Sequence, residues 1–304
     1  MPPFPKKAAT VILLREKESG GFEVFLVRRH EKSSFMAGNF VYPGGRVDPS
    51  DGSPEISACS KGLTSERAHV ILGRSVPPEE CLAYWVAGIR ELFEEAGILF
   101  AYDQQDHLIR IKSVAQQDIF SSYRDLLQKG KVTLWEMARK ERLSFALDHL
   151  HYYTHWITPE AQKYRFNTRF FLARHPAGQE ASFDHAETTA GRWLTPKKAL
   201  EENLTGDVFL SPPTVKTLED LSRFTSIEEV FTSSGKNEAQ TILPILTNTS
   251  EESFILFPWD LEYEAFQRGE IPVRPNHGVP SRPGDNTTRV VLREGRWLPY
   301  CRIK

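Results

Sequence analysis

Cysteine is scarce in this chain, and a long apolar run is absent. Only three cysteines occur among 304 residues, and they are scattered, odd in number and outside CxxC spacing. This usage argues against a disulfide framework or a structural zinc site and favours a reducing compartment. No segment approaches the ~18 continuous apolar residues of a membrane-spanning helix, and the first residues lack the apolar core of a signal peptide. We therefore expect a cytoplasmic protein without a membrane contact.

An excess of charge of either sign is also missing. The chain has 38 lysines and arginines against 40 aspartates and glutamates, which gives a net charge of −2. A protein without a basic field is not expected to bind nucleic acid. Hydrophobic residues make up 40% of the chain, so a real core can form in one large domain or two small ones.

What the chain does contain is an acidic helical segment near residue 90. Glu91, Glu94 and Glu95 are spaced i, i+3 and i+4, which gathers them on one face of a helix. The apolar side chains of the same segment fall on the opposite face: Trp85, Ile89, Leu92, Phe93 and Ala96. An acidic stripe can be an ordinary solvated surface. Because like charges at this spacing repel, a bound divalent cation explains the cluster better.

The remaining pattern mixes strands and helices, which indicates the α+β class. Strands are expected at residues 8–14, 22–27, 40–42, 150–158, 167–173 and 254–257, and a hairpin at 289–300 around a Glu-Gly turn. Helices are expected at 64–74, 78–96, 116–128 and 134–142, after Thr195-Pro196, and at 214–231 with a break near Phe224.

The acidic segment and the glycine turn that precedes it together resemble the Nudix box, GX5EX7REUXEEXGU, in which U is aliphatic. Arg90 to Ile98 match REUXEEXGU without a substitution, and Gly45 matches the first glycine. Gly45 and Arg90 are 45 positions apart, so about 31 residues are inserted, which we place at about 49–78. For the first glutamate of the pattern the sequence offers Asp51 at the GX5E spacing, or Glu79 and Glu80 before the arginine.

The resemblance implies the Nudix fold, a mixed β-sheet sandwiched between α-helices, and a Mg²⁺ or Mn²⁺ site. Glu94 and Glu95 would be metal ligands, Glu91 a further ligand or the base that activates water, and the Gly45 carbonyl an additional ligand. Arg90 would orient a glutamate.

A further catalytic glutamate is implied by the same family. Glu187 lies six residues before Trp193, a spacing at which Nudix proteins often place a glutamate on a loop that reaches the metals.

A branch of this family, the coenzyme A diphosphatases with a long insertion in the box, is the most similar over about residues 8–235. The resemblance lies in the insertion and in the segments 26–30, 38–45, 155–159, 165–171 and 193–194. Substrate phosphates would be held by arginines of these segments: Arg28, Arg29, Arg165 and Arg169.

The implied function is metal-dependent hydrolysis of a pyrophosphate bond in a nucleoside diphosphate derivative, with coenzyme A or acyl-coenzyme A as first choice. The alternative substrates are NADH, ADP-ribose and dinucleoside polyphosphates. A Nudix-like binding or regulatory module without catalysis is the alternative of another class, against which the three retained glutamates argue. We expect a catalytic domain at 1–235 and an extension at 236–304 that packs on the domain or builds a homodimer contact.

Overall fold

The centre of the molecule is a mixed β-sheet with the strand order β10-β2-β1-β9-β8-β11, in which β3 pairs with β2 and β4 with β1. The computed structural model describes residues 3–33, 36–184, 186–236, 239–248, 252–270, 278–282 and 285–301. The strands of this sheet are β1 (Lys6–Glu16), β2 (Phe22–Arg29), β3 (Phe40–Val41), β4 (Gly44–Arg46), β8 (His151–Ile157), β9 (Phe166–Arg174), β10 (Thr188–Leu194) and β11 (Thr241–Ile242). The β1–β9 and β8–β11 pairs are parallel, whereas the other pairs are antiparallel.

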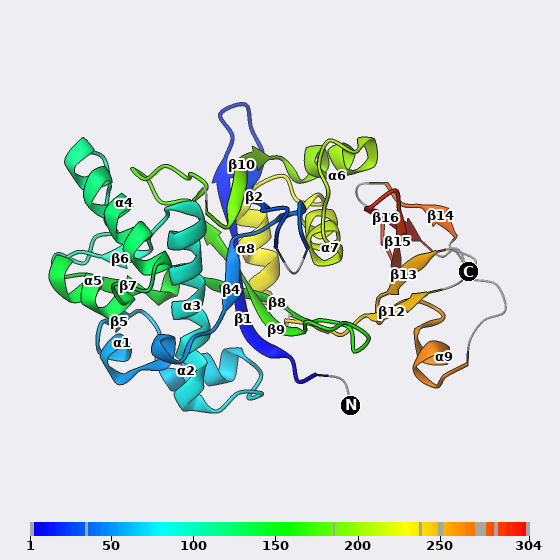
Figure 1. Ribbon diagram of the computed structural model, residues 1–304, viewed down its shortest axis with the longest axis horizontal. Helices are drawn as coiled ribbons and strands as arrows, with labels where there is room; N and C mark the ends of the chain where they lie inside the picture. Colours follow the sequence, from blue (N-terminus) through cyan, green and yellow to red (C-terminus); the bar gives the residue numbers. More distant parts are fainter. Residues whose placement is uncertain are drawn as a thin grey trace.

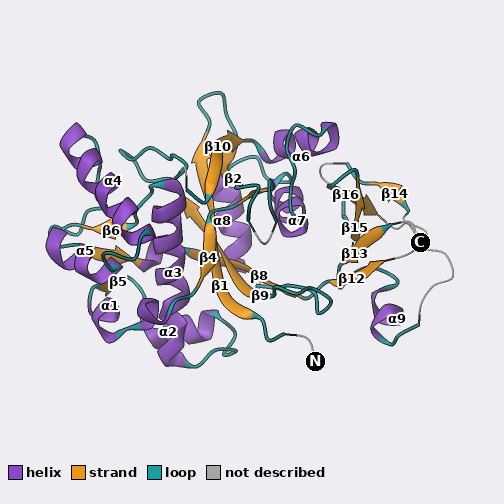
Figure 2. Cartoon of the chain, in the orientation of Figure 1, coloured by secondary structure: helices purple, strands orange, loops and turns teal. Residues whose placement is uncertain are grey.

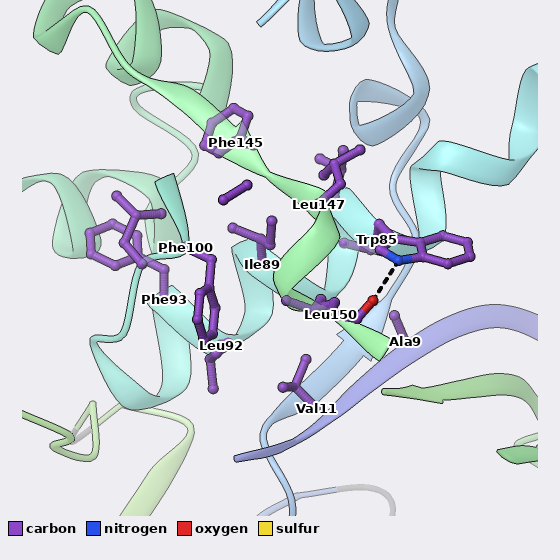
Figure 3. Packing of buried hydrophobic residues seen from close by; sticks show 14 of the residues in the cluster. Ala9, Val11, Trp85, Ile89, Leu92, Phe93, Phe100, Phe145, Leu147 and Leu150 are labelled. Carbon is purple, nitrogen blue, oxygen red and sulfur yellow. Dashed lines mark hydrogen bonds between the residues drawn. The ribbon is translucent and has the colours of Figure 1, made fainter. Parts of the chain in front are cut away.

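Helices cover both faces of this sheet, as the resemblance implied (Figure 1). The strands alternate: Val11 and Leu13 of β1 enter one apolar core, and Ile12 and Leu14 enter the other. The first core is closed by α3 (Pro78–Ala96), and the second by α6 (Pro196–Thr205), α7 (Pro212–Leu221) and α8 (Ile227–Lys236). In the first core Trp85 donates its indole N–H to the Leu150 carbonyl at 2.9 Å (Figure 3).

The insertion packs into a lobe beside α3. It comprises η1 (Pro49–Gly52), α1 (Pro54–Ala58), β5 (Ser60–Lys61) and α2 (Ser65–Ile71). Residues after α3 complete the lobe with β6 (Ala101–Tyr102), α4 (Val114–Gln128), α5 (Leu134–Glu141), β7 (Ser144–Ala146) and η2 (Leu147–His149). A small sheet of order β5-β7-β6 joins the two stretches. Thr64 caps α2, because its Oγ1 accepts the Arg67 N–H at 3.2 Å.

The C-terminal extension folds as a second sheet that lies beside α6 and α7 (Figure 2). It contains β12 (Ile245–Asn248), β13 (Ser253–Leu256), α9 (Tyr263–Gln267), β14 (Val279–Pro280), β15 (Arg289–Arg293) and β16 (Arg296–Cys301), with the order β12-β13-β15-β16-β14. Asn203 Nδ2 of α6 donates to the Trp297 carbonyl at 3.0 Å, and the Thr287 N–H donates to Glu219 Oε1 of α7 at 2.7 Å.

One element differs from the sequence-based expectation. Residues 188–194 form the edge strand β10 rather than only the approach to α6, because they pair with β2. On the acidic face of α3, Glu95 is 3% exposed and Arg90 is 8% exposed. Among the helices of the described residues, none has the length and apolarity to cross a membrane.

Candidate active site

The glycine turn lies directly against the acidic helix, although 45 positions separate Gly45 from Arg90. The Gly44 N–H donates to Glu95 Oε2 at 2.9 Å. A Cβ atom on Gly45 would lie 2.4 Å from Glu91 Oε1, and one on Gly44 would lie 2.5 Å from the Ala9 carbonyl oxygen. Both positions therefore require glycine, which lets the backbone of β4 approach the carboxylates of α3.

Arg90 organises the carboxylates from inside the protein. Its Nε and Nη2 donate to the two oxygens of Asp51, each at 2.9 Å, and Nη2 also donates to the Arg46 carbonyl at 2.8 Å. Nη1 donates to Glu91 Oε1 at 2.9 Å and lies 3.6 Å from Glu94 Oε2. Burial disfavours a charge here, yet these acidic partners hold the pKa of Arg90 above its usual value. Arg90 thus positions Glu91, as expected, and has no free donor pattern for a substrate.

The three helix carboxylates are poorly compensated. Burial is the main cause that raises the pKa of Glu91 to about 7, and the Glu94 charge adds to it. Burial, followed by the Glu91 charge, raises the pKa of Glu95 well above its usual range. Burial also raises the pKa of Glu94, with a contribution from Glu187. Negative charges held close together away from water are the electrostatic condition that a cation relieves.

The donor set fits a hard divalent cation. Glu91, Glu94, Glu95 and the Gly45 carbonyl supply only oxygen ligands, which Mg²⁺ and Mn²⁺ prefer. No three acidic, histidine or cysteine side chains in the described ranges already meet in the arrangement of a metal site. At this cluster Arg90 Nη1 donates to Glu91 Oε1, so the guanidinium offsets part of the negative charge.

The carboxylates open into a cleft of about 960 Å³. Glu91 and Glu94 lie in its wall together with the Gly44-Gly45 turn. Glu187 lines the same cleft from the loop before β10 and is exposed, so a side chain from outside the box does reach the cluster.

The four arginines expected to hold phosphate are not brought together. Arg29 lines the cleft, its charge lowers the pKa of Glu95, and its Nε has no hydrogen-bond partner among the described residues. Arg28 instead binds Glu31 at 2.6 Å. Arg165 is buried and donates to the Thr158 and Pro3 carbonyls.

Arg169 also lies away from the cleft. It is 2% exposed and packs 5.5 Å from the Tyr84 ring centre, and its Nη2 donates to Ser75 Oγ at 3.2 Å.

Sequence reasoning missed one charged residue of the site, Arg46, and left another, Asp51, among alternatives. Arg46, next to Gly45, has an exposed side chain that lines the cleft. Asp51 was one of three alternatives for the first glutamate of the box, and the structure gives it the bidentate contact with Arg90. For Asp51, the GX5E spacing from Gly45 was the feature of the sequence that pointed to the site. For Arg46, the only such feature was its position next to the glycine turn.

Comparison with known proteins points to the same family. A family model described as the NUDT19 Nudix domain matches residues 5–223. The acyl-coenzyme A diphosphatase NUDT19 of Xenopus laevis is 28% identical over 245 residues, which cover 71% of this chain and 64% of that protein. The human protein of the same name is 23% identical over 287 residues, covering 82% and 74%. The crystal structure of a Nudix hydrolase from Alicyclobacillus acidocaldarius is similar with a TM-score of 0.62 and 26% identity, covering 75% of this chain and 96% of that one.

Proposed function

Since the chain belongs to the NUDT19 Nudix domain family, we propose that it is a metal-dependent hydrolase of the pyrophosphate bond in coenzyme A or acyl-coenzyme A. The observation that carries the proposal is the contact between the two halves of the box. Gly44 binds Glu95, and Gly45 lies against Glu91, in the wall of a large cleft. The relatives named acyl-coenzyme A diphosphatase support the choice of substrate.

A pyrophosphate resists hydrolysis because its negative charge repels nucleophiles. Bound Mg²⁺ or Mn²⁺ would neutralise that charge and orient water. Glu91, Glu94, Glu95 and the Gly45 carbonyl would hold the cation. Arg90 keeps the Glu91 carboxylate in place through its own fixed contact with Asp51.

The remaining side chains act on substrate and water. Arg29 has an unpartnered Nε beside the cluster and would bind a phosphate oxygen. Glu187 lines the same cleft and would accept the proton of the attacking water. The water oxygen then bonds to one phosphorus while the bridging P–O bond breaks, and the other phosphate departs with the bridging oxygen.

The cysteines bear on the cellular setting. The three cysteines, Cys59, Cys81 and Cys301, are all free, which suits a reducing compartment such as the cytoplasm. A homodimer built through the extension is also proposed, and sedimentation analysis would test it.

A substrate panel tests the proposed activity. Purified protein is incubated with coenzyme A, octanoyl-coenzyme A, NADH, ADP-ribose and diadenosine tetraphosphate, with Mg²⁺ and with EDTA. We expect 3′,5′-ADP and 4′-phosphopantetheine from coenzyme A with Mg²⁺ alone. Faster cleavage of NADH or a dinucleoside polyphosphate would assign that compound as the substrate in place of coenzyme A. If no compound is cleaved, the alternative of a binding or regulatory module without catalysis would be favoured.

A further inference from the structure

The cleft has two chemically different ends. Every charged side chain that lines it lies near the glutamates: Arg29, Arg46, Asp48, Arg90, Glu91, Glu94 and Glu187. The other end is lined by apolar and uncharged polar residues from β8, β9, α7 and the C-terminal extension. A phosphate would have no cation to pair with at this uncharged end, so an uncharged part of a ligand must lie there.

The walls of the uncharged end are apolar and fixed by packing. Trp156 of β8 contributes a ring that meets Phe257 of the extension edge to face, with centroids 5.8 Å apart. Ile255 and Trp297 bring the extension itself into the lining. At the start of α7, Pro212 and the proline after it lack the N–H groups that a helix otherwise offers to an anion.

One polar atom in this apolar wall has no partner. Trp156 is 4% exposed, and its indole Nε1 is buried without a hydrogen-bond acceptor among the described residues. A buried N–H without an acceptor costs free energy, which a ligand carbonyl in the cleft would recover. The uncharged end therefore offers apolar rings together with an indole N–H that has no acceptor among the described residues.

We propose that this end binds the pantetheine arm and acyl chain of the substrate, that Trp156 Nε1 donates to a carbonyl of that arm, and that the C-terminal extension sets the acyl-chain preference. The proposal rests on the proposed function. Of the two halves of coenzyme A, the adenosine half carries the 3′-phosphate and needs the charged end. The pantetheine half is uncharged and has amide and thioester carbonyls, so it matches the other end.

Substitutions in the extension test the chain-length preference. Trp297→Ala removes an apolar wall, and Leu261→Ala, 51% exposed and outside the cleft lining, is the matched control in the same extension. We expect the ratio of kcat/KM for octanoyl-coenzyme A to that for coenzyme A to fall about tenfold in Trp297→Ala, because the chain loses buried contact. The control keeps the wild-type ratio. An unchanged ratio in a folded Trp297→Ala protein overturns the role of the extension.

The donor is tested by a substitution that keeps an aromatic side chain at position 156. Trp156→Phe keeps an aromatic ring and removes the N–H, so it also serves if Trp297→Ala fails to fold. We expect the inhibition constant of the product 4′-phosphopantetheine to rise about tenfold, while that of 3′,5′-ADP stays the same. Equal changes for both products, or no change, would contradict the placement of the arm.

A failure of the proposed activity can be distinguished from a failure of the proposed subsite. If the wild-type protein cleaves no coenzyme A, the activity proposal fails. Octanoyl-pantetheine, which has no phosphate, then tests the groove by calorimetry. Binding that is weakened by Trp297→Ala supports the apolar subsite, and no binding to the wild-type protein overturns it.

Discussion

Arg90 is a nearly buried guanidinium with four carboxylates around it. Asp51 and Glu91 bind it at 2.9 Å, and Glu94 and Asp48 lie at 3.6 and 3.7 Å. A guanidinium in this setting cannot lose its charge, so it acts as a fixed positive centre from which the acids are oriented. Its partner Asp51 is the more deeply buried of the two aspartates, because the side chain of Asp51 is 1% exposed and that of Asp48 is 52% exposed.

This difference in burial predicts different costs for two similar substitutions. Asp51→Ala leaves Arg90 buried without its bidentate partner and should lower the free energy of unfolding by about 3 kcal/mol. Asp48→Ala removes an exposed carboxylate at longer range and should cost less than ~1 kcal/mol. Urea denaturation of both variants measures the difference. Equal losses would mean that the buried pair has no special role.

The helix glutamates give the sharpest test of the metal site. Glu94→Gln and Glu95→Gln each remove a ligand charge and should lower turnover roughly hundredfold or more. The fold should survive, because relief of like-charge repulsion along α3 does not destabilise the helix. Steady-state rates with a Mg²⁺ titration, together with thermal melts, separate the two effects. Near-normal Mg²⁺-dependent turnover in either variant rules out these roles.

The arginines show where sequence reasoning reaches its limit at single residues. Strands were expected at residues 22–27 and 167–173, close to the observed β2 and β9, but the faces of the arginine side chains were not assigned. Thr168 and Phe170 line the cleft, so Arg169 between them points to the opposite face of the sheet, where it contacts Tyr84 and Ser75. Arg29 lies on the α3 face of the sheet, as Val27 does, and still lines the cleft, whereas its neighbour Arg28 does not. Alternation along a strand therefore gives the face of a side chain but does not decide by itself whether that side chain reaches the cleft.

Elements were predictable where the signal is local. Thr195 caps α6 by accepting the Lys198 N–H at 3.2 Å, and Glu294 and Gly295 adopt positive φ values in the β15–β16 turn. Strand β10 was missed because its burial does not alternate, and its strand conformation comes from pairing with β2. Long-range pairing of this kind leaves little trace in a short stretch of sequence.

The approach of β4 to α3 predicts a strong effect at Gly45. In Gly45→Ala the new methyl group would lie 2.4 Å from Glu91 Oε1, so the carboxylate must move. A displacement of about 1 Å within a catalytic site can cost about hundredfold in rate, which is the expected loss of kcat/KM. Gly235→Ala in α8 is the control, because nothing lies within 4 Å of its Cβ position. Wild-type activity in Gly45→Ala would show that this close contact is dispensable.

At the scale of the whole molecule, the long in-box insertion and the C-terminal extension lie on different sides of the catalytic core. The insertion joins the lobe through the β5–β7 pair and leaves the glycine turn against α3. The extension adds β11 to the edge of the central sheet and then lines the cleft with Ile255 and Trp297. The sequence gave no signal that the extension lines the cleft, because that depends on the packing of β16 against α6 and α7.

The positions of Arg29 and Arg46, two of the arginines that line the cleft, predict how the substrate is recognised. Arg29 lies beside Glu95 and is placed for the diphosphate, whereas Arg46 is exposed at the charged end and is free for the 3′-phosphate. Because a hydrogen bond to a charged group contributes ~1.5–3 kcal/mol, kcat/KM for coenzyme A should exceed that for dephospho-coenzyme A by about tenfold or more. Arg46→Gln should bring this ratio close to one, and Arg29→Gln should lower both values together. If the 3′-phosphate makes no difference in the wild-type protein and NADH is cut faster than either compound, the coenzyme A assignment fails. The metal-dependent hydrolysis of a diphosphate would still stand.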